Sequence, residues 1–104
     1  MEQNFYQKVY EFVKQIPRGR VVSYGIVAAF CGSPKASRSV GAALHRNPDP
    51  KHIPCHRVVF ADGKLAPGFA FGGPDAQRKL LEKEGVKFLA DGNVIMEQFV
   101  WIPL

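Results

Sequence analysis

The chain has 104 residues, of which 46% are hydrophobic, and it carries a formal net charge of +5. That length predicts one domain over residues 1–104 and excludes a second folded core. No apolar run reaches the ~18 residues of a membrane span and no signal peptide opens the chain, so we expect a cytoplasmic protein with no membrane partner.

The positive charge is concentrated in one part of the chain. Between Phe12 and Phe60 there are eight basic residues and a single acid, which gives +7 for this stretch and leaves −2 for the rest. The eight are Lys14, Arg18, Arg20, Lys35, Arg38, Arg46, Lys51 and Arg57. Such a region is typical of a surface that meets phosphates, although a solvated surface rich in lysine and arginine has the same composition.

The first predicted helix is amphipathic. Apolar side chains recur at spacings of one, three or four residues from Phe5 to Ile16, which places them on one face of a helix. Pro17 ends that helix, because proline cannot continue the helical hydrogen bonding. We therefore expect the apolar face to pack on the core of the domain.

Two further helices are predicted close behind the first. Ser23 can cap a helix over residues 24–30, which Gly32 ends. Ser33-Pro34 repeats the same start signal for a third helix that runs to about His45. Two short helices joined by a glycine-containing turn are typical of a helix-turn-helix.

The rest of the chain is predicted to hold shorter elements. Residues 55–63 indicate a short β-hairpin just beyond a cysteine, and residues 65–73 are rich enough in Gly and Pro to form a shaped loop. Pro74 opens a last helix that Gly85 closes, and residues 86–103 form a terminal hairpin or an extended tail. The expected fold is mainly α, a winged-helix-like helix-turn-helix domain with a short β-hairpin.

Cys55 draws attention because Pro54 precedes it and His56 and Arg57 follow it. A thiol is a strong nucleophile only as the thiolate, which needs a nearby base or positive charge. Pro54 makes a special backbone conformation credible, and His56 can act as the base if the chain turns sharply there. A buried structural cysteine beside an exposed histidine fits the same residues. The other cysteine, Cys31, forms no CxxC or disulfide-framework pattern with it, so we expect reduced thiols and no metal site.

Five segments, in order, resemble the DNA-binding domain of the O6-alkylguanine-DNA alkyltransferases. They are residues 16–25, 34–41, 47–48, 54–59 and 80–85, and the resemblance spans residues 16–85. It implies a DNA repair protein that flips O6-alkylguanine out of double-stranded DNA, approached from the minor groove. In such a protein Cys55 attacks the alkyl carbon on guanine O6 and keeps the group as a thioether, in a single-use reaction that needs no cofactor.

The resemblance also implies a catalytic set around the cysteine. His56 acts through a water molecule to deprotonate Cys55, and Glu84 orients and balances that histidine. Asn47 ties the recognition helix to the active-site turn. Without the resemblance, Glu84 has the neighbours of an ordinary solvated helix carboxylate.

A second implied set contacts the DNA. Arg38, on the third helix, fills the gap that the flipped nucleotide leaves, and Ala36, Ser37 and Gly41 are small enough to let the backbone come close to the minor groove. Tyr24 presses on the phosphate beside the lesion. Without the resemblance, Arg38 fits a surface arginine and Tyr24 a core tyrosine.

The implied lesion pocket contains a departure from the transferases. Its expected lining is Tyr24, Pro54, Val58, Phe69, Phe71 and Gly72. Transferases usually have a Tyr-x-Gly-Gly loop beside the guanine, but here residues 69–73 read Phe-Ala-Phe-Gly-Gly, so the hydroxyl that stabilises charge on O6 is absent. This loop looks more like that of the alkyltransferase-like proteins, which bind O6-alkylguanine without repairing it. A larger loop with two phenylalanines also suggests that bulky alkyl groups are admitted.

Three functions stay open from the sequence. Because Cys55 is kept, we place alkyl transfer ahead of a lesion sensor that marks damage for nucleotide excision repair proteins. A winged-helix-like DNA binder without lesion chemistry is the third, while a thiol peptidase or redox protein lacks a supporting motif. We expect a monomer, and a nucleoid-associated protein if the source is bacterial.

Overall fold

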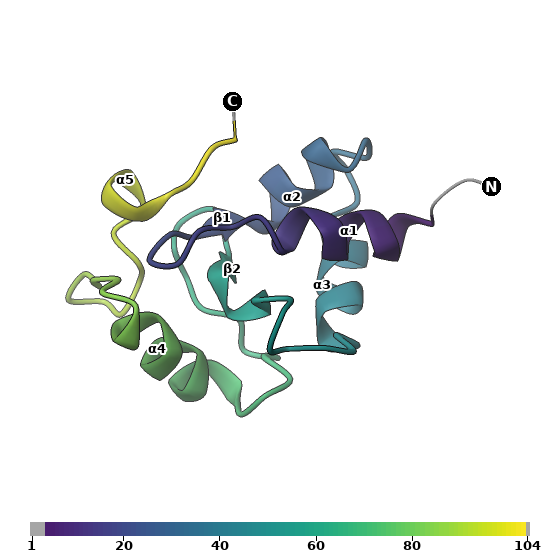
Figure 1. The fold of residues 1–104 in the computed structure, drawn as a ribbon. Helices are drawn as coiled ribbons and strands as arrows, with labels where there is room; N and C mark the ends of the chain where they lie inside the picture. The colour runs from purple at the N-terminus through teal and green to yellow at the C-terminus, as the bar shows by residue number, and fades with distance from the viewer. Residues whose placement is uncertain (1–3, 104) are drawn as a thin grey trace.

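Helices dominate the computed structural model, which describes residues 4–103 (Figure 1). The elements are α1 (Phe5–Val13), β1 (Val22–Ser23), α2 (Tyr24–Phe30), α3 (Ser37–His45), the 3₁₀ turn η1 (Cys55–Arg57), β2 (Val58–Val59), α4 (Gly73–Lys83) and α5 (Met96–Phe99). The mainly α prediction is therefore confirmed. The predicted single domain includes residues 1–3 and 104, which lie outside the described residues. Within the described part of the chain, no helix is both long and apolar enough to cross a membrane.

The small sheet is parallel, so the predicted hairpin beyond Cys55 is wrong. β1 pairs with β2, with Val22 opposite Val58. The predicted turn does exist, since the Phe60 N–H donates to the Lys64 carbonyl at 3.0 Å. The chain after this turn does not pair with β2, and Ala66 donates its N–H to the side chain of Gln77 on α4 at 2.9 Å.

Helices α1, α2 and α3 each pack against the other two, as their sequence patterns indicate. α2 begins and ends as predicted, with Ser23 Oγ accepting from the Ile26 N–H at 3.2 Å. The predicted start of α3 at Ser33-Pro34 is wrong, because the helix begins at Ser37. The Ser33 N–H donates to the Ala28 carbonyl at 3.0 Å and its carbonyl accepts from the Ala36 N–H at 2.8 Å, so Ser33 belongs to a turn between α2 and α3.

The C-terminal part differs more from its prediction. α4 begins around Pro74 as expected, but it is not the last helix, since α5 follows. The predicted terminal hairpin is reduced to a single antiparallel bridge between Phe88 and Val94. The tail is then fixed to the sheet region by two bonds, from Val21 N–H to the Phe99 carbonyl at 2.9 Å and from Trp101 N–H to the Val21 carbonyl at 2.8 Å.

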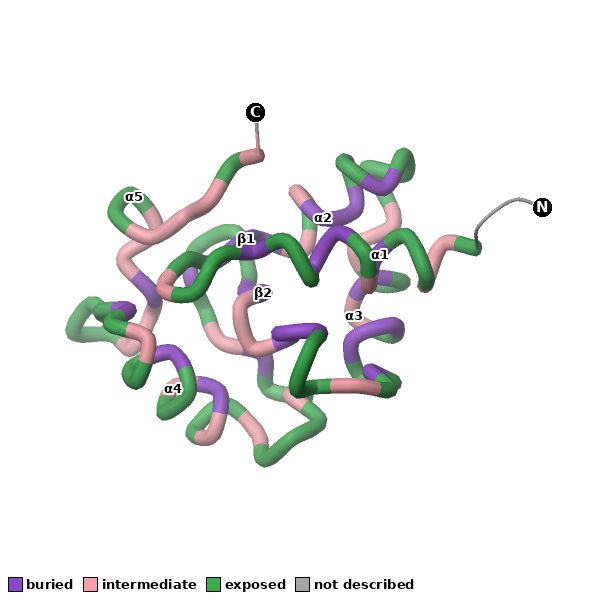
Figure 2. Tube along the Cα trace, in the orientation of Figure 1, coloured by how far each residue is buried: buried purple, intermediate pink, exposed green. Residues whose placement is uncertain are grey.

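Two cores lie on opposite sides of the strands. Figure 2 shows buried positions on α1 to α4 and along both strands. Val22 and Val58 belong to the core under α1, α2 and α3, whereas Val21 and Val59 belong to the core under α4. This follows from the two-residue period of a strand, which directs successive side chains to opposite faces. Cys55 lies in the first core, at the start of η1, the turn that immediately precedes β2.

Candidate active site

The chain bends sharply at Cys55. A sharp bend here is the condition under which we expect His56 to act as a base on the thiol. η1 follows Pro54, whose φ is −76°, and the Arg57 N–H donates to the Pro54 carbonyl at 2.9 Å. Asn47 Nδ2 donates to the Ile53 carbonyl at 2.8 Å, so the residue after α3 is tied to this turn as the resemblance implies. The side chain of Cys55 is buried within the first core.

The Cys55 thiol is held in its protonated form. Burial raises its pKa above the ordinary value of 9.0, although hydrogen bonds from the Asn47 side chain and from backbone groups of Cys55 and His56 act in the opposite direction. Near neutral pH the group is therefore a thiol. A nucleophilic step at Cys55 needs a base that removes this proton.

His56 is suited to be that base. Its Nε2 lies 2.7 Å from Glu84 Oε2, and both side chains are largely buried. Burial lowers the pKa of His56 below its ordinary 6.5, against the opposing effect of Glu84. A carboxylate can only accept hydrogen bonds, so Nε2 carries the proton and the Nδ1 lone pair is left to accept one.

Glu84 stays ionised because neighbouring groups donate hydrogen bonds to its carboxylate. Burial raises its pKa, but hydrogen bonds from Arg57, from His56 and from the Gly19 N–H outweigh that effect and lower the pKa to about 2. Its side chain is only 5% exposed, so the solvated helix carboxylate is ruled out. Glu84 lies at the C-terminal end of α4, whose position brings the carboxylate to η1.

The site contains an arginine, Arg57, that we expected at the surface that meets phosphates. Arg57 donates from Nε and Nη2 to the two oxygens of Glu84, each at 2.9 Å, and from Nη1 to the Ile16 carbonyl at 2.7 Å. Counting Arg57 among the cations for phosphates was therefore wrong. A bidentate pair of this kind fixes the carboxylate in one orientation. The signal that could have revealed the role of Arg57 was Glu84, the carboxylate assigned to His56. A buried carboxylate requires a cation as its partner.

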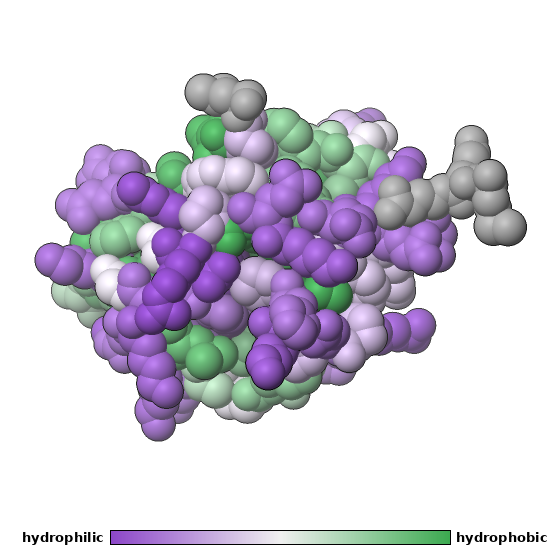
Figure 3. Space-filling view, viewed as in Figure 1, coloured by the Kyte–Doolittle hydropathy of each residue, from purple (hydrophilic) through white to green (hydrophobic). Residues whose placement is uncertain are grey.

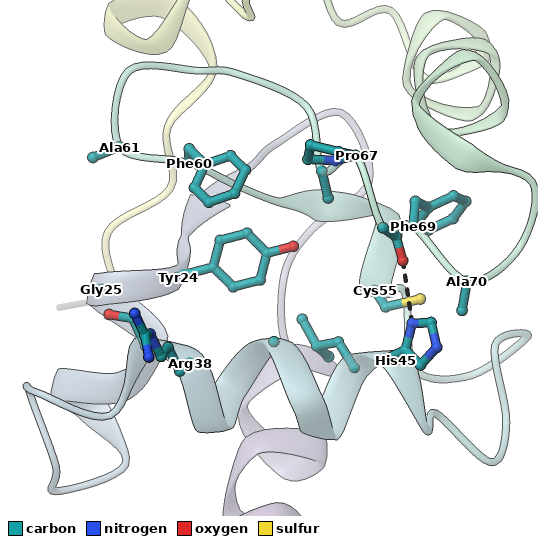
Figure 4. Close-up of a pocket in the computed structure, with 15 residues that line it drawn as sticks. Tyr24, Gly25, Arg38, His45, Cys55, Phe60, Ala61, Pro67, Phe69 and Ala70 are labelled. Carbon is teal, nitrogen blue, oxygen red and sulfur yellow. Dashed lines mark hydrogen bonds between the residues drawn. The ribbon is translucent and has the colours of Figure 1, made fainter.

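Beside Cys55 lies a cavity of about 530 Å³ (Figure 4). Six of the sequence-selected residues line it together: Tyr24, Ser37, Arg38, Gly41, Cys55 and Phe69. In Figure 4, Arg38 and His45 stand at opposite ends of α3, and Cys55 lies beside His45. Burial, and to a smaller extent the charge of Cys55, raises the pKa of Tyr24 to about 12, so its hydroxyl remains a hydrogen-bond donor.

Four residues expected in the pocket do not line this cavity: Pro54, Val58, Phe71 and Gly72. Val58 is fully buried in the first core, and Pro54 is the residue before η1. Phe71 is 41% exposed and contacts the edge of Phe69, with ring centroids 5.8 Å apart. Ala36 also lies outside the lining, as the N-cap of α3. Ala70 and Phe69, the two positions to which the resemblance assigns the missing transferase tyrosine, both line the cavity.

Gln77 is the structural residue that the sequence least revealed. It is fully buried on α4, where Nε2 donates to the carbonyls of His56 at 3.1 Å and Val58 at 3.0 Å. Its Oε1 accepts from the Ala66 N–H at 2.9 Å. This one amide holds η1, β2 and the following loop together. The signal that could have found it is its spacing of four residues from Leu81, which places both on the buried face of α4.

Several of the eight cations between Phe12 and Phe60 are bonded to other parts of the protein. Arg18 donates to the Lys83 carbonyl at 3.1 Å and Arg20 to the Gln98 carbonyl at 2.6 Å. Among the described residues, four of the eight cations have no ion pair or hydrogen-bond partner: Lys35, Arg38, Arg46 and Lys51. All four lie on α3 or the chain beside it. Hydrophilic side chains also predominate on the face in Figure 3, while apolar ones gather near the C-terminus.

The chain is similar to proteins of one family. Residues 4–86 match the sequence model described as the DNA-binding domain of 6-O-methylguanine DNA methyltransferase. The DNA base-flipping protein of Escherichia coli K12 is 39% identical over 102 residues, covering 96% of this chain and 76% of that protein. The methylated-DNA–protein-cysteine methyltransferase of Methanosarcina acetivorans is 47% identical over 81 residues, and the match spans 78% of this chain and 51% of that enzyme.

A third relative matches along nearly its whole length. Alkyltransferase-like protein 1 of Schizosaccharomyces pombe is 36% identical, with 95% of each chain covered. The crystal structure of S. pombe Atl1 in complex with damaged DNA containing O6-carboxymethylguanine superposes with a TM-score of 0.83 at 33% identity, covering 99% of this chain and all of that one. Both the sequence and the fold therefore agree on the family.

Proposed function

Because this chain belongs to the family of the 6-O-methylguanine DNA methyltransferase DNA-binding domain, we propose that it repairs O6-alkylguanine in double-stranded DNA by transferring the alkyl group to Cys55. The observation that carries this proposal is that Cys55 lines the 530 Å³ cavity. Behind it, His56 is neutral and bonded to an ionised Glu84. A flipped guanine in the cavity meets the Cys55 thiol, and His56 follows that residue directly in the chain.

The proposed reaction balances without a cofactor. The Cys55 thiol gives its proton, through a water molecule, to Nδ1 of His56, and Glu84 stabilises the imidazolium that forms. The thiolate attacks the alkyl carbon, an S–C bond forms, and the C–O6 bond breaks with its electron pair passing to guanine. Guanine then takes up one proton. The Tyr24 hydroxyl, which stays protonated, can donate a hydrogen bond to the base during this step.

The proposed DNA contacts follow α3. Arg38, at the mouth of the cavity, enters the gap in the base stack, and the small side chains of Ser37 and Gly41 let the helix approach the minor groove. Lys35, Arg46 and Lys51 contribute sequence-independent attraction to phosphates, which makes affinity fall with salt.

Intact-protein mass spectrometry tests the transfer. After incubation with a duplex that contains O6-methylguanine, we expect the protein to gain one methyl group, which peptide mapping assigns to Cys55. Cys31 is a built-in control because it is buried away from the cavity. The Cys55→Ser variant should gain nothing. Wild-type protein that binds the lesion and stays unmodified overturns the transfer.

A second candidate is a lesion sensor that holds the damaged base without repairing it and marks it for nucleotide excision repair proteins. The specific observation in its favour is that Phe69 and Ala70 line the cavity where transferases supply a tyrosine hydroxyl. Loss of such a donor can cost a few kcal/mol in the transition state, on the order of 3 kcal/mol. The sensor requires lesion preference that persists in Cys55→Ser together with no adduct on the wild-type protein.

A further inference from the structure

His45 is a cavity residue without a role in the proposed reaction. It is the last residue of α3 and lies beside Cys55 in the cavity wall (Figure 4). Its Nδ1 lies 3.2 Å from the Gly68 carbonyl. A carbonyl only accepts, so His45 donates through Nδ1 to the loop on the far side of the cavity.

The loop that receives this bond is a tight turn. The Phe69 N–H donates to the Ala66 carbonyl at 3.1 Å, so Pro67 and Gly68 occupy the central positions. The Gly68 carbonyl is left out of that bond and is available to His45. Ala66, Pro67, Gly68 and Phe69 all line the cavity, so the turn forms one of its walls.

Two side chains attach this wall to the body of the protein, and they differ in exposure. Gln77 accepts the Ala66 N–H at 2.9 Å and is fully buried, so that end of the turn is fixed. The Phe69 carbonyl at the other end accepts from the Gly73 N–H at 2.9 Å, and His45 holds Gly68, between the two ends, from an exposed position on α3. Water can replace the partner of an exposed hydrogen bond when it breaks, so this attachment opens more easily than the buried one at Gln77.

The aromatic ring of the wall is next to the exposed attachment. Phe69 follows Gly68 directly, packs against the core that contains Cys55, and contacts Phe71 on its other side. Gly68, Phe69 and Cys55 line the same cavity. The His45–Gly68 hydrogen bond therefore restrains the part of the wall that carries the Phe69 ring.

We propose that His45 is a specificity-determining residue, a latch whose bond to Gly68 sets the size of O6-alkyl group that the cavity holds. This inference rests on the proposed function. With the latch closed, Phe69 packs against a small group such as methyl. Breaking the latch lets the turn move about its Gln77 attachment, which makes room for a bulky group and loosens the contact with a small one.

The test measures the affinities of duplexes containing O6-methylguanine and O6-benzylguanine, in a Cys55→Ser background so that no transfer occurs. His45→Ala should shift the ratio of affinities towards benzyl by about threefold to tenfold, the range expected for loss of one hydrogen bond. His45→Asn places an amide donor where Nδ1 stands and should restore the original ratio. His52→Ala is the matched control, since His52 bonds to Asp49 at 2.8 Å and does not line the cavity.

The possible outcomes distinguish a failure of the His45 latch from a failure of the proposed function. A parent protein that binds neither lesion better than an undamaged duplex overturns the proposed function, and the latch with it. Lesion preference with the same methyl-to-benzyl ratio in His45→Ala as in His52→Ala overturns the latch alone. A shift in His45→Ala that His45→Asn does not reverse also counts against it, because the donor is then not the cause.

Discussion

Glu84 accepts hydrogen bonds from two side chains at once. It accepts from His56 Nε2 and, with both oxygens, from Arg57. The arginine keeps the carboxylate ionised, and the ionised carboxylate keeps the proton of His56 on Nε2. One buried charge therefore sets the tautomer of the base on which the proposed transfer depends.

Replacing Glu84 by Gln should destabilise the protein and slow transfer. The neutral amide leaves the buried Arg57 guanidinium without its counter-ion, and we expect a loss of about 3 kcal/mol in the free energy of unfolding. Glu82→Gln is the matched control, because Glu82 pairs with Arg78 at the exposed surface and should change stability by less than about 0.5 kcal/mol. Urea denaturation and a single-turnover rate measure both effects; equal stabilities for the two variants contradict this account.

The same cluster predicts a loss of stability in acid. The unfolded chain protonates Glu84 near 4.5 whereas the folded pKa is about 2, so this stabilisation is present above pH 4.5 and disappears as the pH falls from 4.5 to 2. His56 acts in the same direction, because its folded pKa lies below 6.5 and the unfolded chain takes the proton first. Urea midpoints measured across this range should fall less steeply in Glu84→Gln than in the wild-type protein. Parallel curves for the two proteins disprove the assignment.

At the level of single residues, the motif around Cys55 led to the thiol and its base, and the resemblance added Asn47 and Glu84. Arg57 was misassigned because a cation in a basic stretch gives no sign of whether it faces phosphate or a buried carboxylate. Gln77 stayed hidden because its three hydrogen-bond partners come from segments far from it in the chain.

The elements around the site are coupled through α4. Gln77 on that helix bonds to η1, to β2 and to the loop that lines the cavity. Replacing it by Ala removes its hydrogen bonds to the His56 and Val58 carbonyls and to the Ala66 N–H, so we expect a loss of about 2 to 3 kcal/mol. Lys79→Ala, an exposed change on the same helix, should lie within about 0.5 kcal/mol of the wild-type protein.

Hydrogen exchange measures which amides lose protection when Gln77 is replaced. In Gln77→Ala the Ala66 amide should exchange faster, because its acceptor is gone, while amides within α2 should keep their order of protection. An unchanged rate at Ala66 in a folded variant contradicts the coupling.

Local signals predicted the helices better than the sheet. Ser23 and Gly32 bracket α2 correctly because a cap and a left-handed glycine act within a few residues. The pairing of Val22 with Val58 joins distant segments, so no nearby turn encodes it. The extra helix α5 is a single turn whose chain is fixed by bonds to Val21, again a long-range cause.

At the scale of the whole molecule, charge and cavity lie together at α3. Arg38→Ala should lower affinity for an O6-methylguanine duplex by about tenfold, since filling the gap offsets part of the unstacking cost. Arg20→Ala removes the same charge from a residue bonded to Gln98 at 2.6 Å, away from the cavity lining, and should change affinity by less than about twofold. Fluorescence anisotropy at one fixed salt concentration compares them, and equal losses indicate that net charge alone drives binding.

The central claim is that a flipped O6-alkylguanine occupies the cavity against Cys55. A crystal structure of the Cys55→Ser protein bound to a duplex with O6-methylguanine tests it most directly. Our account predicts the guanine between Tyr24 and Phe69, its methyl group facing position 55, with Arg38 in the gap of the base stack. A lesion still stacked in the duplex, or bound outside the cavity, contradicts the account.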